Sequence, residues 1–150
     1  MNGDVIMIAI GCDHAGVEMK KAIIGALSEK GVEFMDLGTD GEPCDYPVMA
    51  EKLCGEVLSG KCEKGILICG TGIGMSIAAN KIKGIRAALC ADSFSTRFTR
   101  LHNDSNVMCL GARTLGCGVA AELAEIFLTT GFEGGRHQRR VDMITDLESK

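Results

Sequence analysis

The sequence has no surplus of basic residues, and this argues against a nucleic-acid partner. Sixteen Lys and Arg residues stand against 20 Asp and Glu residues, for a formal net charge of -4. Nucleic-acid-binding domains usually carry a basic excess. No apolar run approaches the roughly 18 residues that cross a bilayer, and the run at 5–10 lacks the basic flank of a secretory signal. We therefore expect a cytoplasmic protein with neither a nucleic-acid nor a membrane partner.

The cysteines lack the spacing of a disulfide scaffold or a metal site. There are eight of them, but no C-x-x-C motif occurs and no two lie closer than seven residues apart. A hydrophobic content of 46% in 150 residues supplies a core without cross-links. We expect small buried thiols in a reducing compartment, and we expect neither a metal nor a cofactor.

Apolar segments of two kinds alternate along the chain. Nearly continuous runs predict buried strands at 5–10, 66–69, 85–90 and 107–110, and a more polar run predicts an edge strand at 32–37. Helical periodicity appears around 22–27, 49–57, 94–101 and 119–127, with a shorter helix at 74–81. This alternation indicates a doubly wound α/β fold with five mainly parallel strands and helices on both faces. We expect one domain over residues 1–150.

The last twenty residues break the pattern. A glycine-rich stretch at 131–135 precedes a final helix that begins with Arg136 and carries Val141 and Ile144 on one side. This C-terminal arm (residues 131–150) could lie along its own sheet or reach a second subunit, and the sequence leaves both readings open.

The densest functional signal is the glycine-rich turn at 68–74, with the sequence ICGTGIG. A glycine turn that leads into a helix exposes main-chain N–H groups at the positive end of the helix dipole. Such a turn can hold a phosphate, or the oxyanion that forms when a proton leaves carbon next to a carbonyl. A dinucleotide fingerprint is disfavoured, because position 75 is Met and the turn follows the third strand instead of the first.

Several polar residues near predicted strand or helix ends allow a structural and a functional reading. Cys69 is either a core cysteine or a thiolate base or nucleophile. Asp13 with His14, and His102 with Asn103, are either helix caps or site residues. Tyr46 begins a helix or lines a pocket. The cationic candidates, which could fix a phosphate, are Arg113, Arg136 and Arg140, the last two sharing one helix face.

Seven motifs in order resemble the ribose-5-phosphate isomerase B family, which includes allose-6-phosphate and galactose-6-phosphate isomerases. They are GCDHAG (11–16), DYP (45–47), ICGTGIGMSIAANK (68–81), GIRAAL (84–89), RLHNDSNV (100–107), LGAR (110–113) and GGRHQRR (134–140). The resemblance implies a Rossmann-like sheet and the metal-free interconversion of phosphorylated aldoses and ketoses. It also implies a homodimer or homotetramer with the active site shared between subunits, so that the C-terminal helix packs on the partner.

The resemblance also assigns roles to residues. It makes Cys69 the general base, since Met75 stands where one branch of the family has a glutamate base. Main-chain amides of Gly70, Thr71, Gly72, Ile73 and Gly74 would stabilise the enediolate, with the Thr71 hydroxyl nearby. His102 would open the sugar ring with help from Asp13. The implied phosphate contacts are His14, Arg113, Arg136 and Arg140, and Asn103 would bind the sugar.

Ribose 5-phosphate is the expected substrate, and three alternatives remain. The chain could act on a six-carbon phosphosugar, because the sequence does not give the distance between the phosphate-binding residues and the base, which decides the length of the substrate. It could be a sugar-phosphate-binding protein without turnover, which the intact Cys69, Thr71 and His102 set disfavours. A thiol redox protein is disfavoured by the absence of C-x-x-C.

Overall fold

A computed structural model of the chain describes residues 6–150, so Val5 of the first predicted strand lies outside the described part. Its centre is a five-stranded sheet with the order β2-β1-β3-β5-β4, in which every pairing is parallel. The strands are β1 (Met7–Cys12), β2 (Glu33–Asp36), β3 (Lys64–Cys69), β4 (Ala87–Leu89) and β5 (Val107–Gly111). The predicted α/β class and parallel sheet are confirmed, with no antiparallel strand among the described residues.

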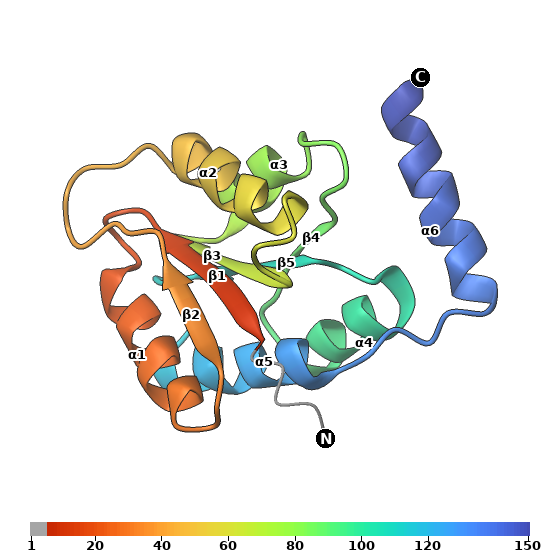
Figure 1. Cartoon of the computed structure of the whole chain (residues 1–150). Helices are drawn as coiled ribbons and strands as arrows, with labels where there is room; N and C mark the ends of the chain where they lie inside the picture. Colours follow the sequence, from red (N-terminus) through yellow and green to blue (C-terminus); the bar gives the residue numbers. More distant parts are fainter. Residues whose placement is uncertain (1–5) are drawn as a thin grey trace.

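Helices cover both faces of the sheet (Figure 1). They are α1 (Val17–Ser28), α2 (Tyr46–Leu58), α3 (Ile73–Ala79), α4 (Ser93–Asn103), α5 (Cys117–Thr129) and α6 (Arg136–Asp146), followed by a 3-10 turn, η1 (Leu147–Ser149). Helices α1, α4 and α5 lie on one face, and α2 and α3 lie on the other. No helix within residues 6–150 is both long enough and apolar enough to cross a bilayer.

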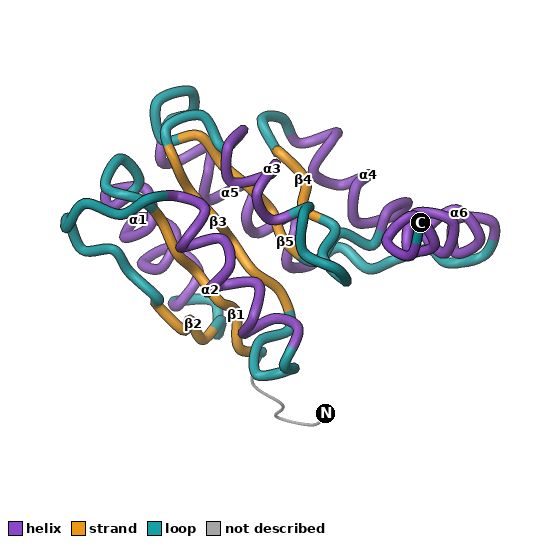
Figure 2. The backbone as a smooth tube through the Cα atoms, turned by 90° about the horizontal axis from the view of Figure 1, so that it is seen from above, coloured by secondary structure: helices purple, strands orange, loops and turns teal. Residues whose placement is uncertain are grey.

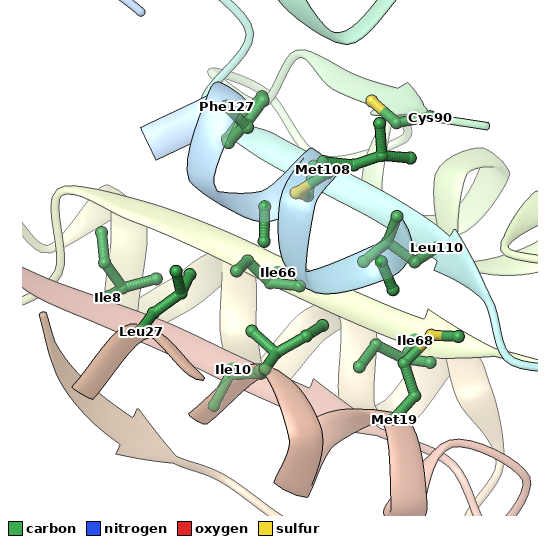
Figure 3. Close-up of a cluster of buried hydrophobic side chains, with 14 of the residues drawn as sticks. Ile8, Ile10, Met19, Leu27, Ile66, Ile68, Cys90, Met108, Leu110 and Phe127 are labelled. Carbon is green, nitrogen blue, oxygen red and sulfur yellow. The ribbon is translucent and has the colours of Figure 1, made fainter. Parts of the chain in front are cut away.

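Side chains alternate between two cores because successive residues of a strand point to opposite faces. The core towards α1 and α5 takes seven residues from the three central strands: Ile8, Ile10, Cys12, Ile66, Ile68, Met108 and Leu110. Figure 3 labels all of these except Cys12. The core towards α2 and α3 takes the residues between them: Ala9, Leu67, Cys69, Val107 and Cys109. Cys69 therefore ends β3 on the α2/α3 face.

The neighbouring strands β1 and β3 form the point where the chain changes direction across the sheet. The chain leaves β1 for α1 on one face and leaves β3 for α3 on the other. At such a point the two connections diverge and open a crevice beyond the carboxyl ends of the strands. Cys12 pairs with Ile68 in this register. The next residue along each chain segment, Asp13 after β1 and Cys69 in β3, therefore lies at the mouth of the crevice.

Two local expectations need correction. Asp13 does not cap α1, because the helix begins at Val17 with Gly16 as its N-cap. The Asp13 carboxylate instead accepts a hydrogen bond of 2.9 Å from the Ala15 N–H in the preceding turn. Strand β4 is three residues long, shorter than the predicted run at 85–90. The Arg86 N–H bonds to the side-chain Oδ1 of Asn106 at 2.9 Å, outside the strand ladder.

The C-terminal arm stands beside the sheet body. Figure 2 shows α6 at one end of the molecule, beyond α4. Gly134 and Gly135 turn the chain there with φ of 68° and 55°, and the Glu133 N–H bonds to the Leu101 carbonyl at 3.0 Å. At the far end of the arm, Glu148 accepts a hydrogen bond from the Gly84 N–H at 2.9 Å. A cavity of about 580 Å³ separates the arm from the segment at 80–88.

Candidate active site

The glycine turn after β3 wraps around the Cys69 sulfur. The Gly72 N–H donates a hydrogen bond of 3.2 Å to Cys69 Sγ. Gly72 has a φ of 79°, and a Cβ on it would lie 2.9 Å from the Leu110 carbonyl carbon, so only glycine fits there. Cys69 is 3% exposed, but its sulfur is turned towards the amides of the loop as well as bordering the core.

The same turn forms the start of α3. Gly72 is the N-cap, and the N–H groups of the first helical residues have no acceptor within the helix. The Ile73 N–H bonds to the Thr71 hydroxyl at 3.2 Å. The N–H groups of Gly74 and Met75 also belong to the first turn, where the helix itself supplies no acceptor. These dipoles favour negative charge near the sulfur and the Thr71 side chain.

A cavity of about 450 Å³ opens over this turn. Its lining residues are Asp13, Tyr46, Cys69, Gly70, Thr71, Ile73, Gly74 and Ile77. The Tyr46 ring lies over Gly74, because a Cβ on Gly74 would come within 2.7 Å of the ring. Asp13 is 8% exposed, and its N–H bonds to the Ile68 carbonyl at 3.0 Å. The fold thus brings a thiol, a hydroxyl, a carboxylate and a phenol to one cavity.

A cation lies beside the turn. The Arg113 N–H bonds to the Gly70 carbonyl at 2.9 Å, and a Cβ on Gly70 would lie 3.7 Å from Arg113 Nη1. The Arg113 side chain is exposed, as is His14, which follows Asp13. We refer to these predicted residues together as the first half-site: Asp13, His14, Tyr46, Cys69, Gly70, Thr71, Gly72, Ile73, Gly74 and Arg113.

His102 and Asn103 lie elsewhere in the chain. They end α4, which runs back from the carboxyl end of β4 to the start of β5. A helix between parallel strands returns the chain to the amino ends of the strands. His102 and Asn103 therefore lie near the amino ends of the strands, whereas Cys69 lies at a carboxyl end. His102 lines a different cavity, of about 370 Å³, together with Leu89 and Phe98.

The two C-terminal arginines accompany His102 instead of Cys69. Arg136 and Arg140 are exposed on α6, and α6 joins α4 through the rings of His137 and His102, which stack with centroids 4.0 Å apart. We refer to His102, Asn103, Arg136 and Arg140 as the second half-site. Within one chain, the predicted site residues therefore form two separate groups.

Two residues that sequence reasoning did not assign complete the surroundings of His102. Glu133 Oε1 lies 3.9 Å from His102 Nε2, and Glu133 Oε2 lies 3.5 Å from His137 Nε2. Burial and then the adjacent imidazole lower the pKa of His137, so its ring is neutral at pH 7. Glu133 and His137 have helical i,i+4 spacing in the sequence, but the two intervening glycines hide it.

Other cysteines near the sheet are poor candidates for a thiolate base. Burial raises the pKa of Cys12, next to Asp13, to about 11. The pKa values of Cys54 and Cys90 are raised to about 11 by the same cause, and burial also raises that of Cys109. These thiols are protonated at neutral pH, and none of the four lines the cavity over the glycine turn.

Known proteins match this chain over most of its length. The model of the Ribose/Galactose Isomerase family matches residues 8–144. Ribose-5-phosphate isomerase B of Escherichia coli (strain K12) is 46% identical over 144 residues, covering 95% of this chain and 97% of that protein. D-erythrulose-4-phosphate isomerase of Pectobacterium atrosepticum is 42% identical over 142 residues, covering 93% of each chain.

A solved structure agrees with the sequence matches. The structure of ribose-5-phosphate isomerase B from Clostridium thermocellum superimposes with a TM-score of 0.93 at 46% identity, covering 96% of this chain and 98% of that one. This chain therefore belongs to the ribose/galactose isomerase family and is a sugar-phosphate isomerase.

Proposed function

We propose that this enzyme interconverts ribose 5-phosphate and ribulose 5-phosphate through an enediolate, with Cys69 as general base. The observation that carries the proposal is the 3.2 Å contact between the Gly72 N–H and Cys69 Sγ at the wall of a cavity. A donor in this position gives negative charge on the sulfur a hydrogen-bond partner. The names of the Escherichia coli and Clostridium thermocellum proteins support the choice of substrate.

The reaction needs a base and an anion hole. It involves no overall change of oxidation state, so it needs no oxidant or reductant. The Cys69 thiolate removes the proton from C2 of the open-chain aldose, and the electron pair moves through C1 to the carbonyl oxygen. A proton passes from the C2 hydroxyl to O1, the proton that the sulfur has gained returns to C1, and C2 becomes the carbonyl carbon. Amides of the turn at 70–74 would stabilise the negative charge in between, at roughly 3 kcal/mol for each well-placed donor.

The second half-site supplies ring opening and phosphate binding in this proposal. His102 transfers the proton that opens the furanose ring, with Asp13 assisting, and Asn103 binds the sugar. Arg136 and Arg140 clamp the phosphate together with Arg113 and His14, since guanidinium groups hold phosphate by paired charge-assisted hydrogen bonds. The binding energy of the remote phosphate positions the reacting carbons.

Two copies of the chain are required to bring these residues together. Cys69 and His102 belong to opposite edges of one sheet, and this supports a site shared between subunits of a homodimer, or of a tetramer built from such dimers. The arm also exposes apolar side chains, among them Met143 and Leu147. A partner that covers this surface would remove it from water.

The proposed chemistry runs without a metal or cofactor, because the thiolate and the main-chain amides supply both the base and the charge stabilisation. We also propose a cytoplasmic location. All eight cysteines lie among the described residues and are free, as expected in a reducing compartment.

The number of carbon atoms in the substrate is the part of the proposal that has specific alternatives, and it can be tested directly. The Pectobacterium atrosepticum relative is named for a four-carbon substrate, and the six-carbon phosphosugars remain open. We would compare kcat/KM for ribose 5-phosphate, allose 6-phosphate, galactose 6-phosphate and erythrulose 4-phosphate, with Cys69→Ala as the blank. The highest value for ribose 5-phosphate supports the proposal. A higher value for another sugar would reassign the substrate, and turnover no greater than that of Cys69→Ala would favour a binding protein.

A further inference from the structure

Three side chains with metal-ligating atoms meet where the arm joins α4. His102, Glu133 and His137 place one ligand atom each within 4.8 Å of one another. The Glu133 carboxylate lies beside both rings, with Oε1 3.9 Å from His102 Nε2 and Oε2 3.5 Å from His137 Nε2. In a tetrahedral zinc site, bonds of 2.0–2.2 Å keep two ligand atoms about 3.4 Å apart. The carboxylate distances are therefore close to those that a bound ion would require.

We propose that His102, Glu133 and His137 form a binding site for a divalent transition-metal ion such as Zn²⁺, and that the bound ion inhibits the isomerase by occupying His102. The inhibition rests on the role of His102 in the proposed function, whereas the binding site does not. Two imidazoles and one carboxylate form an open three-ligand set that leaves one position for water.

The ligand chemistry selects the class of ion. Imidazole nitrogen suits Zn²⁺, Ni²⁺ and Cu²⁺, whereas Mg²⁺ and Ca²⁺ prefer oxygen ligands. Arg136 and Arg140 lie on the same helix as His137, and their positive charges oppose any cation. An ion that is held chiefly by electrostatic attraction to one carboxylate should therefore bind weakly here. An ion that forms strong bonds to nitrogen should bind better.

The surrounding fold holds His137 firmly and leaves the Glu133 carboxylate and the His102 ring room to adjust. His137 is almost completely buried, with its side chain 7% exposed, whereas that of Glu133 is 49% exposed. The Glu133 main chain is fixed by its hydrogen bond to the Leu101 carbonyl, and His102 packs edge-on against Phe98 with ring centroids 4.9 Å apart. The carboxylate can thus rotate towards an ion bound at the nitrogen edge of the two rings.

One adjustment is needed on binding. The two imidazoles stack with an angle of 12° between their planes, but the lone pairs of two ligands must converge on one ion. His102 is the ring that has room to tilt, because its side chain is 34% exposed. A metal would therefore remove the His102 nitrogen from proton transfer and also change the direction in which the ring points.

The site can be tested by measuring zinc binding without any substrate. Metal-free enzyme is titrated with Zn²⁺ against a chromogenic chelator, for the natural chain and for His137→Gln and Glu133→Gln. His14→Gln is the matched control, because His14 is the third of only three histidines and lies outside the cluster. Cys69→Ala controls for binding by the active-site thiol, and Co²⁺ spectra show separately whether any thiolate is a ligand.

We expect one Zn²⁺ per chain, an affinity at least about tenfold weaker in His137→Gln and in Glu133→Gln, and no change in His14→Gln or Cys69→Ala. The half-exposed Glu133 makes its variant informative even if His137→Gln fails to fold. Equal affinity in all five proteins, or loss only in Cys69→Ala, would overturn the site. The ratio of turnover with and without Zn²⁺ is then compared across the natural chain, His137→Gln and Glu133→Gln.

Inhibition of the natural chain that weakens in step with affinity supports the second half of the proposal. Binding with the expected pattern but without inhibition would overturn that half and would also count against the ring-opening role of His102. Failure of the site is thereby distinguished from failure of the proposed function, because binding and turnover are measured separately.

Discussion

The main-chain N–H of Gly72 points at the sulfur of Cys69 across 3.2 Å. This relationship depends on the left-handed backbone of Gly72, which no other residue could adopt beside the Leu110 carbonyl. Cys69 and the first turn of α3 line the same cavity as Asp13. The geometry suits a thiolate that gains a proton while negative charge passes to a neighbouring oxygen.

Replacing Cys69 should separate binding from chemistry. We expect Cys69→Ala to lower kcat by about 100-fold or more, because a general base contributes at least this factor. Affinity for the phosphosugar should change little, since the phosphate contacts remain. Steady-state kinetics and equilibrium binding measure the two effects. Cys44→Ala is the control, because Cys44 is a half-buried thiol outside the cavity; substantial residual turnover by Cys69→Ala would remove the sulfur from the mechanism.

Replacing His102 should distinguish ring opening from enolisation. Ribulose 5-phosphate has no furanose form, because its C5 hydroxyl carries the phosphate. We therefore expect His102→Asn to slow consumption of ribose 5-phosphate at least about tenfold more than exchange of the ribulose 5-phosphate C1 hydrogen with deuterated solvent. Equal losses in the two assays would mean that His102 acts in the enolisation step or only in binding.

The arm should act chiefly on substrate affinity. Arg136→Ala removes a charged donor from the second half-site, and we expect KM for ribose 5-phosphate to rise at least about tenfold with a smaller change in kcat. Arg139→Ala is the matched control. Arg139 is an exposed arginine of the same helix, and its guanidinium contacts Met143 Sδ at 3.8 Å. An unchanged KM in Arg136→Ala, or an equal rise in both variants, would place the phosphate elsewhere.

A buried lysine holds the loop that borders the site. Lys20 is fully buried, and its Nζ donates hydrogen bonds to Asp36 Oδ1 at 2.8 Å and to the Thr39 carbonyl at 2.9 Å. Burial alone would lower the pKa of Lys20, but the bonds to Asp36 and Asp40 outweigh it and raise the pKa. The lysine thus remains charged at neutral pH and needs its partners.

We expect Lys20→Met to lower the free energy of unfolding by about 1–3 kcal/mol, because it removes a donor from the Thr39 carbonyl and from the carboxylates of Asp36 and Asp40. Urea denaturation measures the difference. Lys21→Met, at the exposed neighbouring position, should stay within about 0.5 kcal/mol of the natural chain. Equal stability of the two variants would show that the Lys20 network contributes nothing net.

The sequence predicts the sheet well because each central strand is apolar on both faces. Ile66 and Ile68 face one core while Leu67 and Cys69 face the other, and such a run has few alternatives to a covered parallel strand. The glycine turn was also predictable, since its residues are contiguous in the chain.

Contacts between distant segments were not predictable from local pattern. Lys20 occupies a core position of α1 that only its partners in the loop after β2 explain. The approach of His137 to His102 depends on two glycines that turn the arm back towards α4. His102 and Cys69 lie apart because His102 ends a helix that returns to the amino ends of the strands, whereas Cys69 is the last residue of a strand.

The central claim is that Cys69 of one chain works with His102 of another. Subunit complementation tests it most directly: differently tagged Cys69→Ala and His102→Asn chains are co-expressed, and mixed oligomers are purified and assayed with ribose 5-phosphate. Each variant alone should be nearly inactive, and Cys69→Ala co-expressed with Cys69→Ser is the control for mixing. A shared site in a twofold dimer restores one of the two sites in each mixed pair, so the purified mixed dimers should show about half of natural activity. Activity that stays at the level of the separate variants would contradict the account.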